Sequence, residues 1–284
     1  MKKIKIKAEQ KLPICVAVPI KNEAKNLGQC LPRLTSFNEV WIIDSSSTDQ
    51  SRQITEAFGF NYINFIWNGA FPKKRNWFLQ SNFTQLDWVL FLDADELITD
   101  SFLSEIESVL SDTEHNGFWI TYTNHFLNRP LNHGVPQRKL ALIRNHYAYF
   151  EKIEEDHWTS LDMEVHEHPI VQGTVGQLSA KLIHRDQASY DQIYARHLSY
   201  AKWEAKRYYQ IHNKQFDGSN ALTLRQRLKY SGLASSYFSK LYFIVHYFIL
   251  LGFLDKKEGL KYAQLKYRYF KKIYEEIKFL SKNN

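Results

Sequence analysis

The sequence lacks three features that would assign it at once to a common class of protein. No GxxxxGK[ST] segment occurs and no GxGxxG follows the first apolar stretch, so neither a P-loop nor a dinucleotide fingerprint is supported. The 284 residues include only two cysteines, Cys15 and Cys30, which excludes a disulfide scaffold and is typical of reduced thiols in the cytosol. Residues 1–7 (MKKIKIK) contain no apolar core of a signal peptide, so we expect a cytoplasmic protein.

An apolar run that ends abruptly in acidic residues is the most informative feature that is present. Residues 88–92 (WVLFL) predict a strand buried on both faces, and residues 93–96 (DADE) follow it directly. In extended backbone alternate side chains share a face, so Asp93 and Asp95 can address one ligand together. Hard oxygen ligands of this kind suit Mg²⁺ or Mn²⁺ that carries substrate phosphates. The alternative is a solvated acidic turn ahead of the next helix.

Strands and helices alternate over about the first 110 residues. Residues 14–20 and 40–43 are apolar and strand-like, and each stretch is followed by polar residues and a helical pattern. Asp44 ends the second strand, and residues 45–49 (SSSTD) supply capping side chains for a helix that reaches about Phe58. The pattern predicts an α/β fold, with a mainly parallel, Rossmann-like sheet flanked by helices.

Four blocks in this part of the chain resemble, in their order, the family 2 glycosyltransferases with the GT-A fold. They are residues 18–23 (VPIKNE), 43–49 (IDSSSTD), 69–76 (GAFPKKRN) and 92–95 (LDAD). Enzymes of this family are inverting and use nucleotide sugars. The resemblance implies a GT-A catalytic domain over residues 1–188, with a nucleotide-sugar half at about 12–98 and an acceptor half at about 99–188.

The same resemblance implies roles for single residues. Pro19, Asn22 and Glu23 would line the pocket for the nucleotide base, and Asp44 would contact the uridine. The remaining nucleotide-sugar contacts would come from Lys74, Arg75, Asn76 and Asp93. Ser-Ser stands at positions 45–46 where Asp-Gly is more usual in the family, which leaves the local turn geometry open. Taken singly, each of these residues also has a plain structural reading as a strand end, a helix cap or a solvated charge.

Inverting transfer is a direct displacement that needs a base for the acceptor hydroxyl and a Lewis acid for the departing diphosphate. Glu167 is assigned as the base by its likeness to the family's acidic residue at the start of the acceptor-side helix, with Glu164 and Asp162 as alternatives. His184 follows an apolar segment and resembles the C-terminal metal-binding histidine of many GT-A enzymes. Asp95 and His184 would then bind one Mn²⁺ or Mg²⁺, with diphosphate oxygens completing the coordination.

Two predicted strands, at residues 117–122 and 140–144, are separated by a loop rich in Gly, Pro and Asn at residues 128–137. A loop of this length is often functional, and the family similarity suggests that it lies on the acceptor side.

Residues 166–168 (HEH) also raise a zinc hypothesis. They lack the spacing of HExxH, and Pro169 argues against a long helix there. A structural zinc would need more soft ligands than two distant cysteines offer. His166 and His168 are therefore interpreted as polar neighbours of the site or as solvent-facing side chains.

The C-terminal part of the chain combines apolar and basic residues. Apolar side chains at helical spacing over residues 190–208 predict an amphipathic helix, and residues 255–284 hold nine Lys or Arg against four Asp or Glu. The apolar, aromatic-rich residues 241–254 would make a helix of about 21 Å, short of a hydrocarbon core of about 30 Å. We therefore expect residues 189–284 to form a helical region that contacts an anionic membrane surface, on the inner face of the cytoplasmic membrane, without spanning it. The alternative is a helix buried against the catalytic domain, and nucleic-acid binding is not expected.

Residues 251–255 (LGFLD) and Gly259 add a short resemblance to bacterial lipopolysaccharide-core and capsule glycosyltransferases. The resemblances together imply a metal-dependent, hexosyltransferase-type enzyme. It would move a sugar from a nucleoside diphosphate, with UDP expected, to a saccharide acceptor on a lipid-linked glycan. A sugar-phosphate nucleotidyltransferase and a catalytically inactive membrane-surface scaffold are the alternatives. The first should carry a glycine-rich, basic loop after its first strand, which residues 21–23 (KNE) do not supply.

Overall fold

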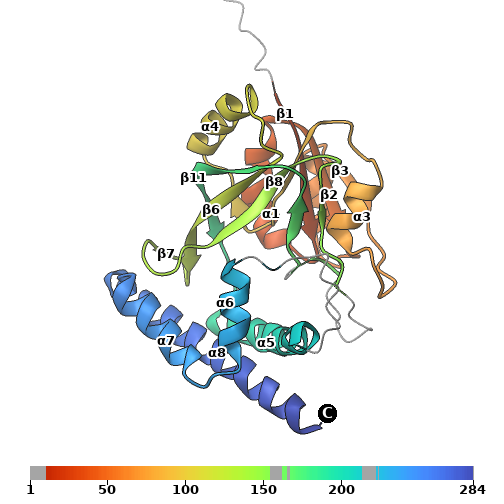
Figure 1. Cartoon of the computed structure of the whole chain (residues 1–284). Helices are drawn as coiled ribbons and strands as arrows, with labels where there is room; N and C mark the ends of the chain where they lie inside the picture. Colours follow the sequence, from red (N-terminus) through yellow and green to blue (C-terminus); the bar gives the residue numbers. More distant parts are fainter. Residues whose placement is uncertain (1–10, 154–161, 165–166, 213–221, 223, 284) are drawn as a thin grey trace, which may run out of the picture. The chain divides into compact units, whose positions relative to one another are not determined.

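The computed structural model describes residues 11–153, 162–164, 167–212, 222 and 224–283 (Figure 1). The chain divides into two compact units: unit 1 is Met1–Tyr122 with Gln137–Arg185, and unit 2 is Thr123–Pro136 with Asp186–Asn284. The domain boundary expected at residue 188 stays a prediction. The compact units differ from it because the segment Thr123–Pro136 groups with the C-terminal helices.

Strands form most of unit 1, and the longest helices lie in unit 2. The strands are β1 (Leu12–Ile20), β2 (Phe37–Asp44), β3 (Asn61–Asn64), β4 (Trp88–Phe91), β5 (Glu96–Leu97), β6 (Gly117–Phe126), β7 (Arg129–Leu131), β8 (Arg138–Arg144), β9 (Ala148–Phe150), β10 (Pro169–Val171) and β11 (Val175–Arg185). The helices are α1 (Ala24–Cys30), η1 (Leu31–Leu34), α2 (Ser51–Ala57), α3 (Lys74–Gln80), α4 (Asp100–Leu110), α5 (Tyr190–His212), α6 (Leu224–Leu233), α7 (Phe238–Ile244), η2 (Val245–Ile249), η3 (Gly252–Asp255) and α8 (Lys256–Asn283).

Nine of the described strands form one sheet in the order β3-β2-β1-β4-β8-β6-β11-β5, with β7 paired to β6 (Figure 1). β1 is parallel to β2 and β4, and β2 is parallel to β3, so the first half has the predicted parallel arrangement. β8 is antiparallel to both β4 and β6, and β11 is antiparallel to β5. Parallel neighbouring strands require a crossover connection, usually a helix. β6 and β8 are joined by a hairpin segment instead, so this half of the sheet is antiparallel.

The central strands are buried on both faces, so their alternate side chains enter two hydrophobic layers. On one face Val16 packs in a cluster with Leu27 of α1 and Phe102 of α4. On the other face Cys15 packs in a second cluster with Phe78 of α3. Every residue of β4 is buried, which confirms the strand predicted ahead of the acidic residues. Both cysteines are buried and free, as the sequence predicted.

Unit 2 is helical. α5, which the amphipathic pattern predicted, packs with α6 and α8 around Ala201, Tyr230 and Ile273. The hairpin of β6 and β7 belongs to the same unit, because Phe126 packs with Ile193 of α5 and Leu265 of α8. Among the described helices, none is by itself long and apolar enough to cross a membrane, whereas the bent pair Phe238–Ile249 and Gly252–Lys282, at 75°, passes the same test of length and composition.

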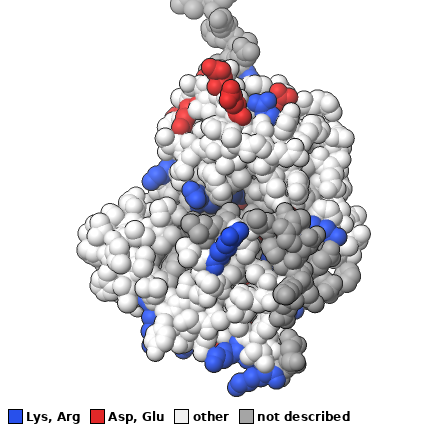
Figure 2. All heavy atoms as spheres, in the orientation of Figure 1, with Lys and Arg blue, Asp and Glu red and all other residues white. Residues whose placement is uncertain are grey.

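The apolar residues 241–254 do not form one straight helix. α7 continues into the π-helical turn η2, Leu251 then adopts φ 59°, and the short η3 precedes α8. A left-handed residue cannot continue a helix, so the chain turns there. We call residues 237–254 the elbow. Figure 2 shows few charged atoms on the surface at the elbow, on the left of that view.

Candidate active site

Asp44 ends β2, and its buried carboxylate organises the turn that follows. Its Oδ2 accepts hydrogen bonds from the Ser47 N–H at 2.8 Å and from the Tyr62 hydroxyl at 2.6 Å. Ser47 Oγ also donates to Oδ1. Ser46 has φ 58°, in the left-handed region that favours glycine. The Ser-Ser pair that departs from the family pattern therefore adopts a turn in which glycine would be the unstrained residue.

The turn after β1 is fastened to the turn after β2. Asn22 has φ 57° and donates its N–H to Ser47 Oγ at 2.7 Å, while the Glu23 N–H donates to Ser51 Oγ at 3.0 Å. Pro19 lies buried in β1 just before this turn. The residues predicted to line the base pocket thus lie at the carboxyl ends of two adjacent parallel strands. This is the edge at which open α/β sheets bind their ligands.

The basic residues at the start of α3 contact the acidic residues Asp162, Glu164 and Glu167. Lys73 Nζ lies 2.5 Å from Glu167 Oε1, and both side chains are buried. Lys74 Nζ donates to the Ile20 carbonyl at 3.1 Å and lies 3.6 Å from Asp162 Oδ2. Burial lowers the pKa of Lys74, and the nearby Asp162 carboxylate opposes that shift. These lysines are therefore buried, paired cations and not the solvated charge run of the structural alternative.

Glu164 caps α3 from a distant part of the chain. Its Oε2 accepts from the Arg75 N–H at 2.8 Å, and its Oε1 accepts from the Asn76 N–H at 2.9 Å. Asn76 in turn donates from Nδ2 to the Phe150 carbonyl and accepts from the Phe150 N–H, both at 2.8 Å. This cap satisfies the first backbone N–H groups of α3, which begins at Lys74.

Asp93 is held between two cations. Its Oδ1 accepts from Arg75 Nη2 at 2.8 Å, and its Oδ2 accepts from Lys139 Nζ at 2.8 Å. Burial by itself would raise the pKa of Asp93, but Lys139 and Arg75 outweigh it and hold the pKa below its usual range. The Arg75 contact links the start of α3 to the end of β4, and so joins two of the four blocks that carry the family resemblance.

Glu96 shares the Lys139 cation with Asp93. Lys139 Nζ lies 3.4 Å from Glu96 Oε1, and Glu96 Oε2 accepts from the Asp93 N–H at 3.0 Å. Burial, partly offset by Lys139 and reinforced by the Asp93 charge, raises the pKa of Glu96 to about 7. Asp93 and Glu96 therefore differ in character, because the adjacent cations lower the pKa of Asp93 whereas burial raises the pKa of Glu96.

Asp95 and His184 lie together, as the metal hypothesis requires. Asp95 Oδ2 is 3.3 Å from His184 Nε2, and both side chains are partly exposed. The contact arises because β11 pairs antiparallel with β5, which sets His184 opposite Glu96 in the register. One carboxylate oxygen and one imidazole nitrogen fit a divalent cation whose other positions are filled by phosphate oxygens.

A metal cluster built from protein ligands alone is absent from the described residues, where no group of three or more His, Cys, Asp or Glu could hold an ion. For the zinc hypothesis, His166 lies outside the described residues, and Glu167 is paired with Lys73.

Sequence reasoning missed Lys139 and the role of Tyr62. Lys139 lies at the start of β8, and only the antiparallel pairing of β8 with β4 brings it to Asp93. No local motif signals such a contact. Tyr62 could have been noticed, because β3 is parallel to β2. Tyr62 lies opposite Ile42, two residues before Asp44, and so on the same face of the sheet as Asp44.

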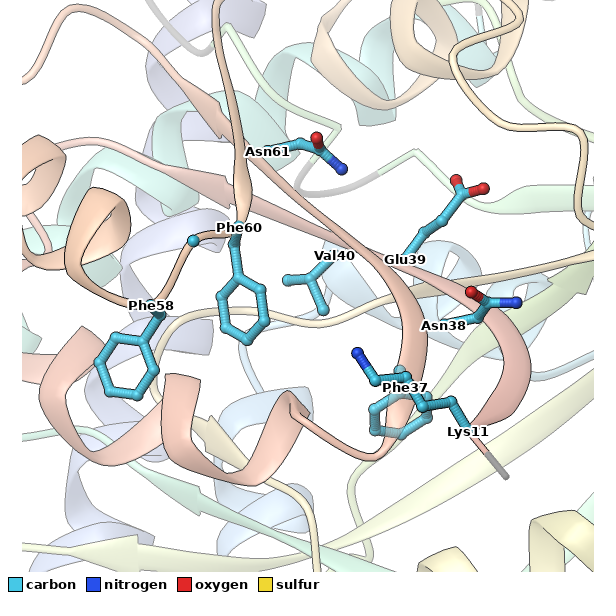
Figure 3. Close-up of a pocket in the computed structure, with 9 residues that line it drawn as sticks. Lys11, Phe37, Asn38, Glu39, Val40, Phe58, Phe60 and Asn61 are labelled. Carbon is cyan, nitrogen blue, oxygen red and sulfur yellow. The ribbon is translucent and has the colours of Figure 1, made fainter. Parts of the chain in front are cut away.

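A pocket of about 160 Å³ lies away from these residues (Figure 3). Phe37 and Val40 at the start of β2 line it together with Phe58 and Asn61 ahead of and at the start of β3. This is the amino end of the parallel strands, opposite to the edge that carries Asp44. The pocket therefore does not belong to the candidate site.

Residues 15–167 match the model of the family described as glycosyl transferase family 2. The chain belongs to this family. The matched range covers more than half of the 284 residues and includes every predicted site residue except His184. The predicted α/β fold class with a helical C-terminal region is also confirmed.

The chain is similar over part of its length to several bacterial proteins. An uncharacterized glycosyltransferase of Rickettsia felis is 33% identical over 97 residues, which are 34% of this chain and 32% of that protein. The lipopolysaccharide core biosynthesis glycosyltransferase LpsC of Rhizobium meliloti is 24% identical over 186 residues, which are 61% of this chain and 63% of that protein. The matches thus span about one third to just under two thirds of these relatives' own lengths.

Two solved structures are similar at low identity. S. aureus TarS 1-349 is 18% identical with a TM-score of 0.42, over 94% of this chain and 92% of that one. Glucosyl-3-phosphoglycerate synthase of Mycobacterium tuberculosis, solved with Mn²⁺, UDP and glucosyl-3-phosphoglycerate, is 20% identical with a TM-score of 0.31, over 39% of this chain and 44% of that one. Both TM-scores lie below 0.5, and neither structure assigns a role to a residue of this chain.

Proposed function

We propose that this family 2 glycosyltransferase moves a sugar from UDP to a hydroxyl of a saccharide acceptor, with inversion. The observation that carries the proposal is the joining of the basic start of α3 to the carboxyl ends of the strands. Arg75 bonds to Asp93 after β4, and Lys74 bonds to the last carbonyl of β1. Buried cations next to an ordered polar turn suit a donor that carries a diphosphate on one side and a nucleoside on the other.

Asp95 and His184 are the residues that would hold Mn²⁺ or Mg²⁺. Their oxygen and nitrogen atoms are 3.3 Å apart, which supports binding of one ion by both. When bound, the ion supplies a Lewis acid for the departing diphosphate. Asp93 is already neutralised by Arg75 and Lys139, so we assign it to orienting these cations toward the donor and not to the metal.

Glu167 is our choice for the base that takes the proton of the acceptor hydroxyl. It lies buried with one carboxylate oxygen 2.5 Å from Lys73 Nζ, and a carboxylate is a common general base. Glu164 is a poor alternative, because both of its oxygens accept backbone N–H groups of α3. Asp162 stays open as an alternative, since its side chain is partly exposed and bonds to Ser45.

The acceptor that we propose is a lipid-linked glycan of the lipopolysaccharide-core type, with transfer at the inner face of the cytoplasmic membrane. The similarity to LpsC of Rhizobium meliloti supports this class of acceptor, at 24% identity. The identity of the sugar and the linkage depend on the shape of loops that no motif specifies.

A donor screen tests the function. The purified protein is mixed with a panel of nucleotide sugars, Mn²⁺ and a truncated core glycolipid, and release of nucleoside diphosphate is measured. Acceptor-dependent release of UDP is the expected result. A nucleotidyltransferase would instead consume a nucleoside triphosphate and release pyrophosphate, and an inactive scaffold would bind neither UDP nor Mn²⁺ in calorimetry.

A further inference from the structure

The exposed apolar side chains of this chain are concentrated at the elbow. Of the seventeen large hydrophobic side chains that are exposed in the described chain, nine lie within the eighteen residues of the elbow. These nine are Tyr237, Leu241, Ile244, Phe248, Ile249, Leu250, Leu251, Phe253 and Leu254. Single exposed apolar residues are ordinary on protein surfaces, but a contiguous group marks an interaction surface.

The elbow is firmly built, so its exposed face is not a consequence of loose packing. Gly252 lies so close to the preceding turn that a Cβ there would be 2.7 Å from the His246 carbonyl oxygen. A Cβ on Gly259 of α8 would be 2.1 Å from the Gly252 carbonyl oxygen. Both contacts are possible only for glycine, which fixes the bend between η2 and α8.

The inner side of the elbow holds residues of the segment between β7 and β8. The Gly134 N–H donates to the Leu250 carbonyl at 2.8 Å, and the Val135 N–H donates to His246 Nδ1 at 3.1 Å. The Asp255 carboxylate, just beyond the elbow, accepts from the His133 N–H at 2.9 Å. The polar groups of the bend are therefore satisfied from within unit 2, and the outer face that remains is apolar.

Basic residues flank this apolar face. Lys240 lies within the elbow, and Lys256 and Lys257 follow it directly. α8 as a whole carries nine Lys or Arg and three Glu, a balance of +6. An apolar surface beside positive charge is complementary to the surface of a bilayer that contains anionic lipid.

We propose that the elbow docks this enzyme on an anionic lipid bilayer by shallow insertion, without crossing it. This goes beyond the proposed transfer reaction and does not depend on it. Among the described helices no single one is suited to span, which is consistent with insertion at the interface. Because the elbow and the adjoining Asp255 bind residues 132–135, docking also fixes this segment between β7 and β8 at the membrane surface.

Vesicle flotation tests the proposal with the full-length protein. Wild type should float with vesicles of phosphatidylcholine and phosphatidylglycerol, bind pure phosphatidylcholine much more weakly, and dissociate as salt is raised. Phe248→Ser with Ile249→Ser should weaken partitioning at least about tenfold, since both apolar side chains that would insert into the bilayer are removed. Lys256→Gln with Lys257→Gln should weaken binding to anionic vesicles alone.

The matched control is Ile66→Ser with Leu228→Ser, which removes two apolar side chains outside the elbow that are at least as exposed, and it should float like wild type. Thermal unfolding of each variant confirms that it is folded. Flotation that the elbow variants leave unchanged would overturn the proposal. So would failure of wild type to bind any vesicle, resistance of the bound protein to alkaline carbonate, or a wild-type dimer in light scattering that the Phe248→Ser, Ile249→Ser variant converts to monomer.

Hydrogen exchange tests the link to the segment between β7 and β8. The amides of Asn132, His133, Gly134 and Val135 all donate to the elbow or to Asp255, so their exchange should slow when anionic vesicles are added. Unchanged exchange at these amides in protein that floats would refute fixation of the segment between β7 and β8 by docking.

Discussion

At the residue scale, the two aspartates after β4 differ in what surrounds them. Asp93 has a cation on each oxygen, whereas Asp95 is next to a histidine and partly open to solvent. We therefore expect Asp95→Ala to abolish Mn²⁺-dependent binding of UDP and nearly all transfer, with little change in the free energy of unfolding. Calorimetry with and without Mn²⁺ measures this. Asp100→Ala, at an exposed acidic residue in the first turn of α4, serves as the control and should bind like wild type. Full transfer by Asp95→Ala in the presence of a chelator would contradict a metal-dependent mechanism.

The assignment of the base is tested at Glu167. Glu167→Gln keeps the size of the side chain but removes its basicity, so transfer should fall about 10²–10⁴-fold while UDP binding stays close to that of wild type. The substitution also leaves Lys73 as a buried cation without this partner, which costs stability. The double variant Glu167→Gln, Lys73→Gln should recover much of the thermal stability and still fail to transfer. Normal transfer by Glu167→Gln together with loss in Asp162→Asn would assign the base to Asp162.

Replacing serine by glycine should change the stability in opposite directions at Ser46, in the turn after Asp44, and at Ser104. Ser46 has φ 58°, so Ser46→Gly should relieve backbone strain and stabilise the protein by up to about 1 kcal/mol. Ser104, exposed within α4, has helical backbone, and Ser104→Gly should destabilise by roughly 0.5–1 kcal/mol. Thermal or urea unfolding distinguishes the two shifts. Destabilisation by Ser46→Gly would mean that its hydroxyl matters more than its backbone.

At the element scale, local pattern was enough for most strands and helices. β4 is an apolar run, α5 has one apolar face, and Asp44 ends β2 as predicted. The start of α3 could not be predicted, because its cap comes from Glu164, eighty-eight residues beyond Asn76. The bend at Leu251 could not be predicted either, since hydropathy does not report a left-handed residue. Contacts made by distant elements, such as Lys139 with Asp93, have no local signal at all.

The pairing of α5 with α8 should be sensitive to acid. His197 of α5 donates from Nδ1 to the Ile193 carbonyl and lies 3.1 Å from Lys266 Nζ of α8. Burial and the Lys266 charge lower the pKa of His197 to about 3. The unfolded chain takes up this proton near pH 6.5 and the folded chain does not, so stability present above pH 6.5 is lost as the pH falls toward 3.

The measurement is the urea unfolding free energy of wild type and His197→Gln between pH 7.5 and 4. The variant should be less stable at neutral pH but lose less stability on acidification. His246, whose pKa burial and Lys266 lower to about 4, adds a similar dependence in both proteins, so the slope should shrink and not vanish. Parallel pH profiles for the two proteins would show that His197 does not report on the α5–α8 contact.

At the scale of the whole molecule, the two compact units predict how the chain behaves when it is cut. The sequence suggested a boundary near residue 188, but the segment Thr123–Pro136 packs within unit 2. Phe126 and Leu131 contact a cluster that includes Ile193 and Leu265. A chain cut after residue 188 would therefore leave these apolar side chains uncovered, and we expect it to aggregate or unfold at a lower temperature than the full chain.

The same fragment should be rescued by removing the hairpin segment. The Tyr122 N–H donates to the Gln137 carbonyl at 3.3 Å, so the strands on either side of the segment are adjacent and a two-residue Asn-Gly turn can join them. Residues 11–188 with 123–136 replaced by Asn-Gly should be soluble, monomeric and cooperative in thermal unfolding. It should also retain UDP binding, because the donor-site residues all lie in unit 1. The fragment 11–188 that keeps residues 123–136 is the comparison. If it is already monomeric and equally stable, these residues do not depend on the C-terminal helices, and the boundary near residue 188 describes the folding units better.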